Sequence, residues 1–171
     1  MERARRDPEA FGELYLRHVR SIYNYIFYRT GDPEEAEDLT SRVFLQALQH
    51  LPRFQERGLP FAAWLFRIAH NLVANWHRDR RRRPVVPLSE NGHERAPDRV
   101  EALVERQEER ERLLRALRRL PPDRQQLLIL KFVEGLSNAE IARIMGRTEG
   151  AIRALYHRTL EALRKELLRE P

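Results

Sequence analysis

The chain has 171 residues and a net charge of +6, with 42% hydrophobic and 34% charged residues. This balance supports one or two small domains with modest apolar cores and argues against a largely disordered chain. No stretch approaches the roughly 18 consecutive apolar residues of a membrane span, and the first residues lack the apolar segment of a signal peptide. The absence of cysteine excludes disulfides, thiolate metal sites and cysteine nucleophiles, so we expect a cytoplasmic protein.

The charges are distributed unevenly along the chain. Residues 1–83 carry 15 basic and 11 acidic side chains, residues 84–111 carry 4 and 8, and residues 112–171 carry 13 and 7. Two basic segments therefore flank an acidic connector. Arginine supplies nearly all of the positive charge, and its planar guanidinium suits bidentate contacts with phosphate and guanine. The codon bias of a GC-rich genome explains the arginine content equally well, so charge alone does not establish a nucleic-acid partner.

Helical spacing of apolar residues dominates the sequence, and no segment alternates like a strand. We expect a first helix over residues 7–31 and a second over 32–51, each opened by an Asp-Pro pair that caps the helix and fixes its first turn. A loop over 51–60 precedes a third helix over 61–80. The residues expected on the core face of the third helix are Trp64, Leu65, Ile68 and Leu72.

A polar segment over 84–97, with two prolines and no periodicity, indicates a linker. A charged helix is expected from residue 98 to the Pro121-Pro122 pair. Another helix is expected over 123–134, where it ends before a glycine.

Residues 137–168 have the pattern of a helix-turn-helix. Ser137 and Glu140 predict a capping box at the start of a short helix over 140–145. A turn that contains Gly146 follows, and a longer helix continues towards residue 168. The apolar residues expected between the two helices are Ile141, Ala142, Ile144, Ile152, Tyr156 and Leu160.

The outer face of the longer helix is basic and fits the major groove, where arginine reaches base edges or phosphates. The residues expected on this face are Arg153, Ala154, His157 and Arg158. The alternative is a helical bundle whose arginines are only solvated. The capping box, the glycine turn and the basic face together favour DNA.

The third predicted helix offers a second candidate surface. It interleaves aromatic side chains with amides and cations and ends in the arginine run 80–83. Such a face can stack unpaired bases and follow a single-stranded backbone. Core packing is the better explanation of Phe61 and Trp64, but Asn71 costs helix propensity and indicates a polar role.

Metal and catalytic sites are not predicted. His70 and His77 share a helix face but lack a further ligand at suitable spacing, so solvated histidines explain them better than a metal site. The sequence has no glycine-rich phosphate loop and no carboxylate pair in apolar surroundings. We therefore expect no enzyme, no cofactor, no small-molecule substrate and no membrane contact.

Three segments, by their order and spacing, resemble bacterial sigma-70 family factors of the extracytoplasmic-function (ECF) type. They are PEEAEDLTSRVFLQAL, PFAAWLFRIAHNLVANWHRDRRR and LPPDRQQLLILKFVEGLSNAEIARIMGRTEGAIRALYHRTLEALRK. The resemblance spans nearly the whole chain and implies an all-α fold of two small domains joined by a flexible linker. These would be a region 2-like domain over 1–83, an acidic linker over 84–111 leading into the first region 4 helix, and a region 4-like helix-turn-helix domain over 112–171.

The implied function is promoter recognition and DNA melting for RNA polymerase. Asn71 matches the family position that helps to capture a flipped base of the −10 element, and the loop over 51–60 would complete that pocket. The further candidates for the −10 strand are Phe54, Arg67, Asn75, Arg78 and Arg80. The residues that would dock on the clamp helices of the polymerase β′ subunit are Asp38, Leu39, Arg42, Phe44 and Gln46.

Region 4 would read the −35 element. The residues that match its groove-facing positions are Arg153, Ala154, Leu155, His157 and Arg158, and Lys131 matches a phosphate contact. Ser41-Arg42 stands where many relatives have Gln-Glu, Asn75 where they have Asp, and Leu155 where they have Arg. The implied partners are core RNA polymerase, through its β′ clamp helices and β flap, promoter DNA and an anti-sigma factor.

Two alternatives stay open from the residues alone. One is a helix-turn-helix regulator in which residues 1–83 form a sensor or dimerisation domain, which leaves Asn71 and the arginine run without a role. The other is a helical enzyme, for which the sequence offers no converging nucleophile, base or metal set.

Overall fold

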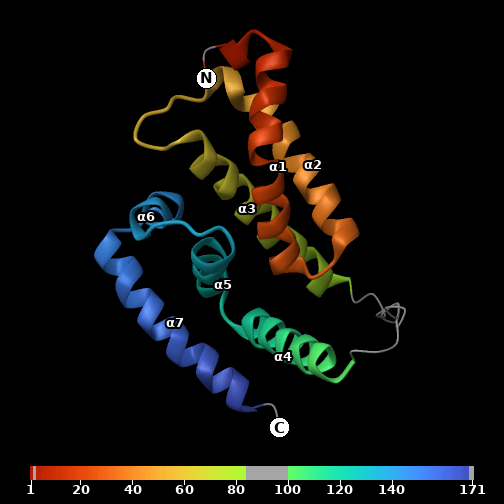
Figure 1. Ribbon diagram of the computed structural model, residues 1–171. Helices are drawn as coiled ribbons and strands as arrows, with labels where there is room; N and C mark the ends of the chain where they lie inside the picture. Colours follow the sequence, from red (N-terminus) through yellow and green to blue (C-terminus); the bar gives the residue numbers. More distant parts are fainter. Residues whose placement is uncertain (2, 84–99, 170–171) are drawn as a thin grey trace.

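The computed structural model describes residues 1, 3–83 and 100–169, and the predicted all-α fold is confirmed there (Figure 1). The predicted linker over 84–97 lies outside the described residues. The elements are η1 (Arg3–Arg5), α1 (Pro8–Thr30), α2 (Pro33–His50), η2 (Leu51–Arg53), α3 (Phe61–Arg82), α4 (Val100–Arg119), α5 (Pro122–Leu128), η3 (Ile129–Val133), α6 (Asn138–Met145) and α7 (Glu149–Arg169). No helix in this part of the chain is long and apolar enough to span a membrane.

The boundaries of α1 and α2 follow the predicted capping signals. The Asp7 carboxylate accepts a hydrogen bond from the Glu9 amide at 3.0 Å, and the Asp32 carboxylate accepts one from the Glu34 amide at 3.0 Å. Gly31 ends α1 in the left-handed region, with φ at 72°, and donates its amide to the Phe27 carbonyl at 2.7 Å. A side chain at this φ would be strained, so glycine permits the sharp turn into α2.

Helices α1, α2 and α3 pack together as one bundle, since each contacts the other two (Figure 1). Ile26, Leu39, Val43 and Leu65 are completely or almost completely buried between them. Trp64 and Ile68, predicted for the core face of α3, are only partly buried, whereas Leu65 and Leu72 are buried as predicted. The bundle therefore buries the apolar stripe of α3 and leaves the polar stripe of the same helix exposed to solvent.

The prediction of one helix over 123–134 is wrong in one respect, because the α-helical geometry ends at Leu128. Residues Ile129–Val133 form a π-helical turn, in which the Glu134 amide donates to the Ile129 carbonyl at 3.1 Å. The Leu136 amide then donates to the Leu130 carbonyl. Side-chain periodicity hardly distinguishes one π turn from an α turn, so the sequence carried no signal for it.

The helix-turn-helix is confirmed, including its capping box. The Glu140 amide donates to the Ser137 hydroxyl at 3.2 Å, and the Ser137 amide donates to the Glu140 carboxylate at 2.8 Å. The short helix begins at Asn138, two residues before the predicted start. Gly146 adopts the left-handed conformation at the turn, with φ at 64°.

The register of α7 differs from the prediction. Its buried residues are Ile152, Leu155 and Thr159, whereas Tyr156 is partly buried and Leu160 is 37% exposed. The Thr159 hydroxyl donates to the Leu155 carbonyl at 2.6 Å, which satisfies this polar group inside the core. Tyr156 and Leu160 were predicted to lie between the two helices because they continue the helical spacing of apolar residues from Ile152.

An arginine is buried in the first bundle without an acidic partner among the described residues. Arg29 is 1% exposed, and its Nη1 donates to the Tyr25 hydroxyl at 2.8 Å and lies 3.1 Å from His70 Nδ1. Its Nε has no hydrogen-bond partner. A buried charge that is compensated only by neutral groups carries a large desolvation cost.

We predict that Arg29→Met increases the free energy of unfolding by about 1–2 kcal/mol, because it removes this buried charge and keeps most of the volume. Urea denaturation followed by circular dichroism measures the change. Arg29→Ala is the control, since it removes the same charge but leaves a cavity and should destabilise the fold. A large loss of stability in the methionine variant would show that the charge is well compensated.

Candidate nucleic-acid interface

The polar stripe of α3 forms the first candidate surface. Asn71 is exposed, and it lines a cavity together with Arg67 and His70 of the same helix. The opposite wall of this cavity is formed by the second half of the chain, through Asp123, Gln126, Ile144, Met145 and Arg147. The structure therefore brings Asn71 and Arg67 together, as the sequence predicted, but places another module in front of them.

Phe54 does not have the position that was predicted for it. Its ring is stacked on Trp64 at 4.4 Å between centroids, and the residue is only 8% exposed. Arg5 of η1 donates a hydrogen bond to the Phe54 carbonyl, which fixes the backbone at the end of η2. Phe54 thus closes the bundle core in this structure and does not offer a free face to a base.

The C-terminal turns of α3 form an exposed cationic end. Arg78 donates to the Asn75 side-chain oxygen, and the Arg80 guanidinium lies 4.7 Å from the centre of the Trp76 ring. Asn75, Arg78 and Arg80 are exposed, as their predicted role requires. Both interactions lie on the surface and are weak enough to exchange for contacts with a nucleic acid.

Beneath this surface lies the group of Tyr25, Arg29 and His70. Burial and the nearby Arg29 charge lower the pKa of His70 from 6.5 to about 4, and burial raises the pKa of Tyr25 to about 12. His77 is similar, since burial and Arg29 lower its pKa. Both histidines are therefore neutral at pH 7 and partly buried in the fold, so the prediction of solvated histidines is wrong.

The outer face of α7 is the second candidate surface. Arg153, Ala154, His157 and Arg158 are all exposed, as predicted. No other described residue forms an ion pair or hydrogen bond with the Arg153 or Arg158 guanidinium, so both are available to a ligand. Leu155 was predicted for the same face, and that prediction is wrong because this side chain is 3% exposed and packs in the core.

Lys131 lies beside this surface but is already engaged. Its Nζ donates to the Asn138 side-chain oxygen at 2.8 Å and lies 5.0 Å from the centre of the Tyr156 ring. Both partners are neutral, so the ammonium charge is not cancelled. A phosphate can approach the remaining N–H groups.

The predicted polymerase-binding residues of α2 divide into two sets. Asp38, Arg42 and Gln46 are exposed, and the Arg42 guanidinium lies 4.0 Å from the Asp38 carboxylate. Leu39 and Phe44 are buried, which corrects their assignment to a docking surface. Leu45 and Leu48 are instead the exposed apolar residues of this face, at 55% and 47%. The docking role of Leu39 and Phe44 was implied by the family resemblance, which does not determine the exposure of each side chain.

The described residues contain no group of three or more His, Asp or Glu side chains placed so that they could hold a metal ion. His70 and His77 are each engaged with Arg29, through its guanidinium and its carbonyl respectively. The geometry thus consists of two separate polar helix faces and one mixed apolar and charged face.

Comparison with known proteins agrees with this arrangement. The model of sigma-70 region 2 matches residues 14–83, and the model of sigma-70 region 4 matches residues 110–163. The chain is 42% identical over 165 residues to the ECF RNA polymerase sigma factor BldN of Streptomyces coelicolor, which covers 94% of this chain and 61% of BldN. It is 30% identical over 157 residues to the ECF RNA polymerase sigma factor SigL of Mycobacterium tuberculosis, which covers 90% and 86%.

Among solved structures, the fold is similar to that of the sigma factor RpoE from Bartonella quintana, which was crystallised with the anti-sigma factor NepR. The TM-score is 0.68 at 22% identity, and the match covers 95% of this chain and 99% of RpoE. The chain therefore belongs to the sigma-70 family of RNA polymerase sigma factors and to its ECF type. Membership of this family disfavours the helix-turn-helix regulator as the alternative.

The His70 environment predicts a pH-dependent stability. The folded state favours the neutral ring down to about pH 4, whereas the ring of the unfolded chain takes up a proton near pH 6.5. The stabilisation that the neutral His70 ring gives to the folded state is therefore complete above pH 6.5 and is lost as the pH falls towards 4. His70→Gln should reduce the decrease in the free energy of unfolding between pH 7 and pH 5, measured by urea denaturation at each pH. An unchanged pH dependence of the free energy of unfolding in this variant would contradict the lowered pKa of His70.

Proposed function

We propose that this chain directs RNA polymerase to promoters and helps to melt them, with α3 holding the unpaired −10 strand and α7 reading the −35 duplex. The observation that carries the proposal is the presence of two polar helix faces of different character on two modules. One combines Asn71 with cations and neighbouring aromatic residues, and the other carries exposed arginines at helical spacing. We assign residues 1–83 to the first module and 112–171 to the second, with 84–111 as the acidic connection.

The two faces suit two different states of DNA. Holding a base outside the stack costs a few kcal/mol, so a melting surface has to bind single strands better than duplex. An amide such as Asn71 can pair with the edge of a flipped base, and Arg67, Asn75, Arg78 and Arg80 can follow the backbone. A bound strand would also have Trp76 available for stacking once Arg80 moves from its ring.

Duplex recognition requires a helix that enters the major groove. The arrangement of α6 and α7 is that of a helix-turn-helix, whose second helix presents residues from its N-terminal half to base edges. Arg153 and Arg158 are suited to guanine or phosphate, Ala154 and His157 can lie between them, and Lys131 can hold the adjacent backbone. Leu155 supports this helix from the core.

The polymerase would be held by the exposed face of α2. Asp38, Arg42 and Gln46 provide polar contacts, and Leu45 and Leu48 provide apolar area, which together match the composition of a protein interface. We assign the β′ clamp helices to this face and the β flap to the second module. The protein would act by binding alone, without an active site, in the cytoplasm where polymerase and DNA meet. An anti-sigma factor is a further proposed partner, by analogy with RpoE.

Gel filtration with purified core polymerase tests the proposed association. The chain should elute with the core enzyme, and Leu45→Asp combined with Leu48→Asp should abolish co-elution because charge replaces the apolar contact. Arg153→Ala is the matched surface control and should co-elute normally. Separate elution of the unmodified chain would refute the proposed function.

Asn71→Ala should impair promoter melting more than formation of the closed complex, because the proposed partner of this amide is an unpaired base. Permanganate footprinting measures melting, and a gel shift at low temperature measures closed-complex binding. Normal melting by the variant would remove Asn71 from the site.

Arg153→Ala should reduce discrimination between the cognate and an altered −35 sequence by about 1–3 kcal/mol if the guanidinium reads a base. Competition binding with the two duplexes at fixed salt gives this difference. An equal loss of affinity for both duplexes would instead assign Arg153 to a phosphate.

A further inference from the structure

Two neighbours of His70 determine which nitrogen of its ring carries the proton. The Arg29 guanidinium lies 3.1 Å from Nδ1 through its Nη1, and a guanidinium can only donate a hydrogen bond. The Tyr25 hydroxyl lies 2.9 Å from the same Nδ1 and accepts a hydrogen bond from Arg29 at 2.8 Å, so its own proton can point at Nδ1. Nδ1 is therefore an acceptor, and the neutral ring carries its proton on Nε2.

The surroundings of His70 keep the ring neutral. Burial and the Arg29 charge lower the pKa of His70 from 6.5 to about 4, and the Asp123 charge of the second module opposes this shift. Asp123 is itself paired with Arg147 at 3.2 Å, which offsets the only acidic charge that acts on the ring among the described residues. The proton on Nε2 thus belongs to an uncharged group.

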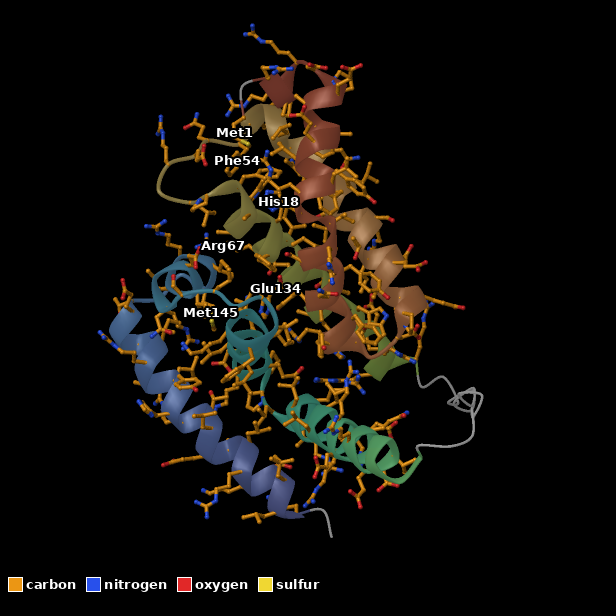
Figure 2. All side chains as sticks on the ribbon, in the orientation of Figure 1. Met1, His18, Phe54, Arg67, Glu134 and Met145 are labelled. Carbon is orange, nitrogen blue, oxygen red and sulfur yellow. The ribbon has the colours of Figure 1, made fainter. Side chains whose placement is uncertain are left out.

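The Nε2 donor has no partner within the described part of the chain. Both hydrogen bonds of the ring use Nδ1, and Nε2 is not one of the fully buried polar atoms. The ring lines the cavity in front of α3, whose two sides are marked by Arg67 and Met145 (Figure 2). Asn71 lines the same cavity. An unused donor therefore lies directly beside the amide of the proposed −10 surface.

Arg67, the cation next to these two groups on α3, is engaged within the protein. It donates from Nε to the Ile144 carbonyl at 3.0 Å and from Nη2 to the Arg143 carbonyl at 2.7 Å. The His70 donor differs from it, because it is unused, uncharged and held in one direction by groups beneath the surface.

We propose that His70 is a hydrogen-bond donor of the −10 surface, which rests on the function proposed above. Its Nε2 proton meets an oxygen of the unpaired strand, a base carbonyl or a phosphate oxygen, beside the base that Asn71 captures. Arg29 and Tyr25 are positioning residues, because they orient the ring and keep the proton on the outer nitrogen. The buried charge of Arg29 thus presets a donor, so that no change of tautomer is needed when a strand binds.

Nitrogen-15 NMR of the imidazole rings tests the position of the proton without DNA. At pH 7 the unmodified chain should show His70 as the neutral tautomer with the proton on Nε2, and the signals that disappear in His70→Gln identify this ring. A proton on Nδ1, or one on each nitrogen, would overturn the proposal. The measured tautomer is that of the unmodified chain, so a folding defect in a variant does not affect it.

Two substitutions distinguish the two nitrogens of the ring. His70→Gln can place an amide N–H near the position of Nε2, whereas His70→Asn can replace only the Nδ1 acceptor of Arg29. In complex with core polymerase, His70→Asn should bind a single-stranded −10 oligonucleotide about threefold to tenfold more weakly and His70→Gln within about twofold of normal, as expected for one neutral hydrogen bond. Co-elution with core polymerase confirms that both variants are folded. Equal losses in the two variants, or a loss in neither, would contradict the assignment.

The salt dependence of binding separates a neutral donor from a cation. His70→Asn should weaken binding by the same factor at every salt concentration, because a neutral group displaces no counterion. Arg78→Ala is the matched control on the same helix and should reduce the slope of log affinity against log salt by about 0.7. A reduced slope in His70→Asn would assign a charged role to this residue and refute the neutral donor.

Modified oligonucleotides identify the acceptor on the strand. Abasic and methylphosphonate substitutions are introduced at each −10 position in turn, and binding is measured with the unmodified chain and with His70→Asn. If Nε2 meets a base, one abasic position should cancel the effect of His70→Asn, and if it meets a phosphate, one methylphosphonate position should do so. An undiminished effect at every modified position would show that His70 contacts no acceptor on the strand. If the unmodified complex does not bind the −10 oligonucleotide, the proposed function itself fails.

Discussion

Each candidate DNA surface depends on a helix that buries one stripe and leaves the opposite stripe free. In α3, Leu65, Leu72 and Val73 are held in the bundle while Asn71, Asn75 and Arg78 face outward. In α7, the buried residues are Ile152, Leu155 and Thr159, and the arginines lie on the opposite, exposed side. Apolar burial therefore fixes the rotation of each helix about its axis, and this rotation decides which side chains a nucleic acid can meet.

Capping and packing explain which features could be predicted. The Asp-Pro starts, the glycine ends and the Ser137–Glu140 capping box are local signals, because the residues that make them lie within four positions of each other. Helix boundaries and the helix-turn-helix were therefore predictable. Exposure of Asn71 and of Arg153 followed from the same local periodicity, with the family resemblance adding their proposed roles.

The features that could not be predicted depend on residues far apart in the sequence. Arg29 is buried because α3 supplies His70 beside it, and Phe54 is buried because Trp64 covers its ring. Leu155 and Leu160 are both leucines on one helix, and only the packing against α5 and α6 decides which of them is inside. The contact of Arg67 with α6 joins residues more than 70 positions apart, for which the sequence holds no local signal.

The two modules differ in their exposed faces and are also packed against each other. They carry polar helix faces of different character, on α3 and on α7, and they bury apolar residues against each other. The contact between them combines hydrogen bonds from Arg67 to two α6 carbonyls with a half-buried Glu134 carboxylate, one oxygen of which has no hydrogen-bond partner.

The central claim is that two modules read two separate promoter elements for one polymerase. Run-off transcription with purified core polymerase and this chain, on a library in which both promoter elements are randomised independently, tests it most directly. The account predicts that transcribed templates share one motif around −10 and a second around −35, and that transcription depends on the added chain. Transcripts that are independent of the chain, or templates without a shared motif at either position, would contradict it.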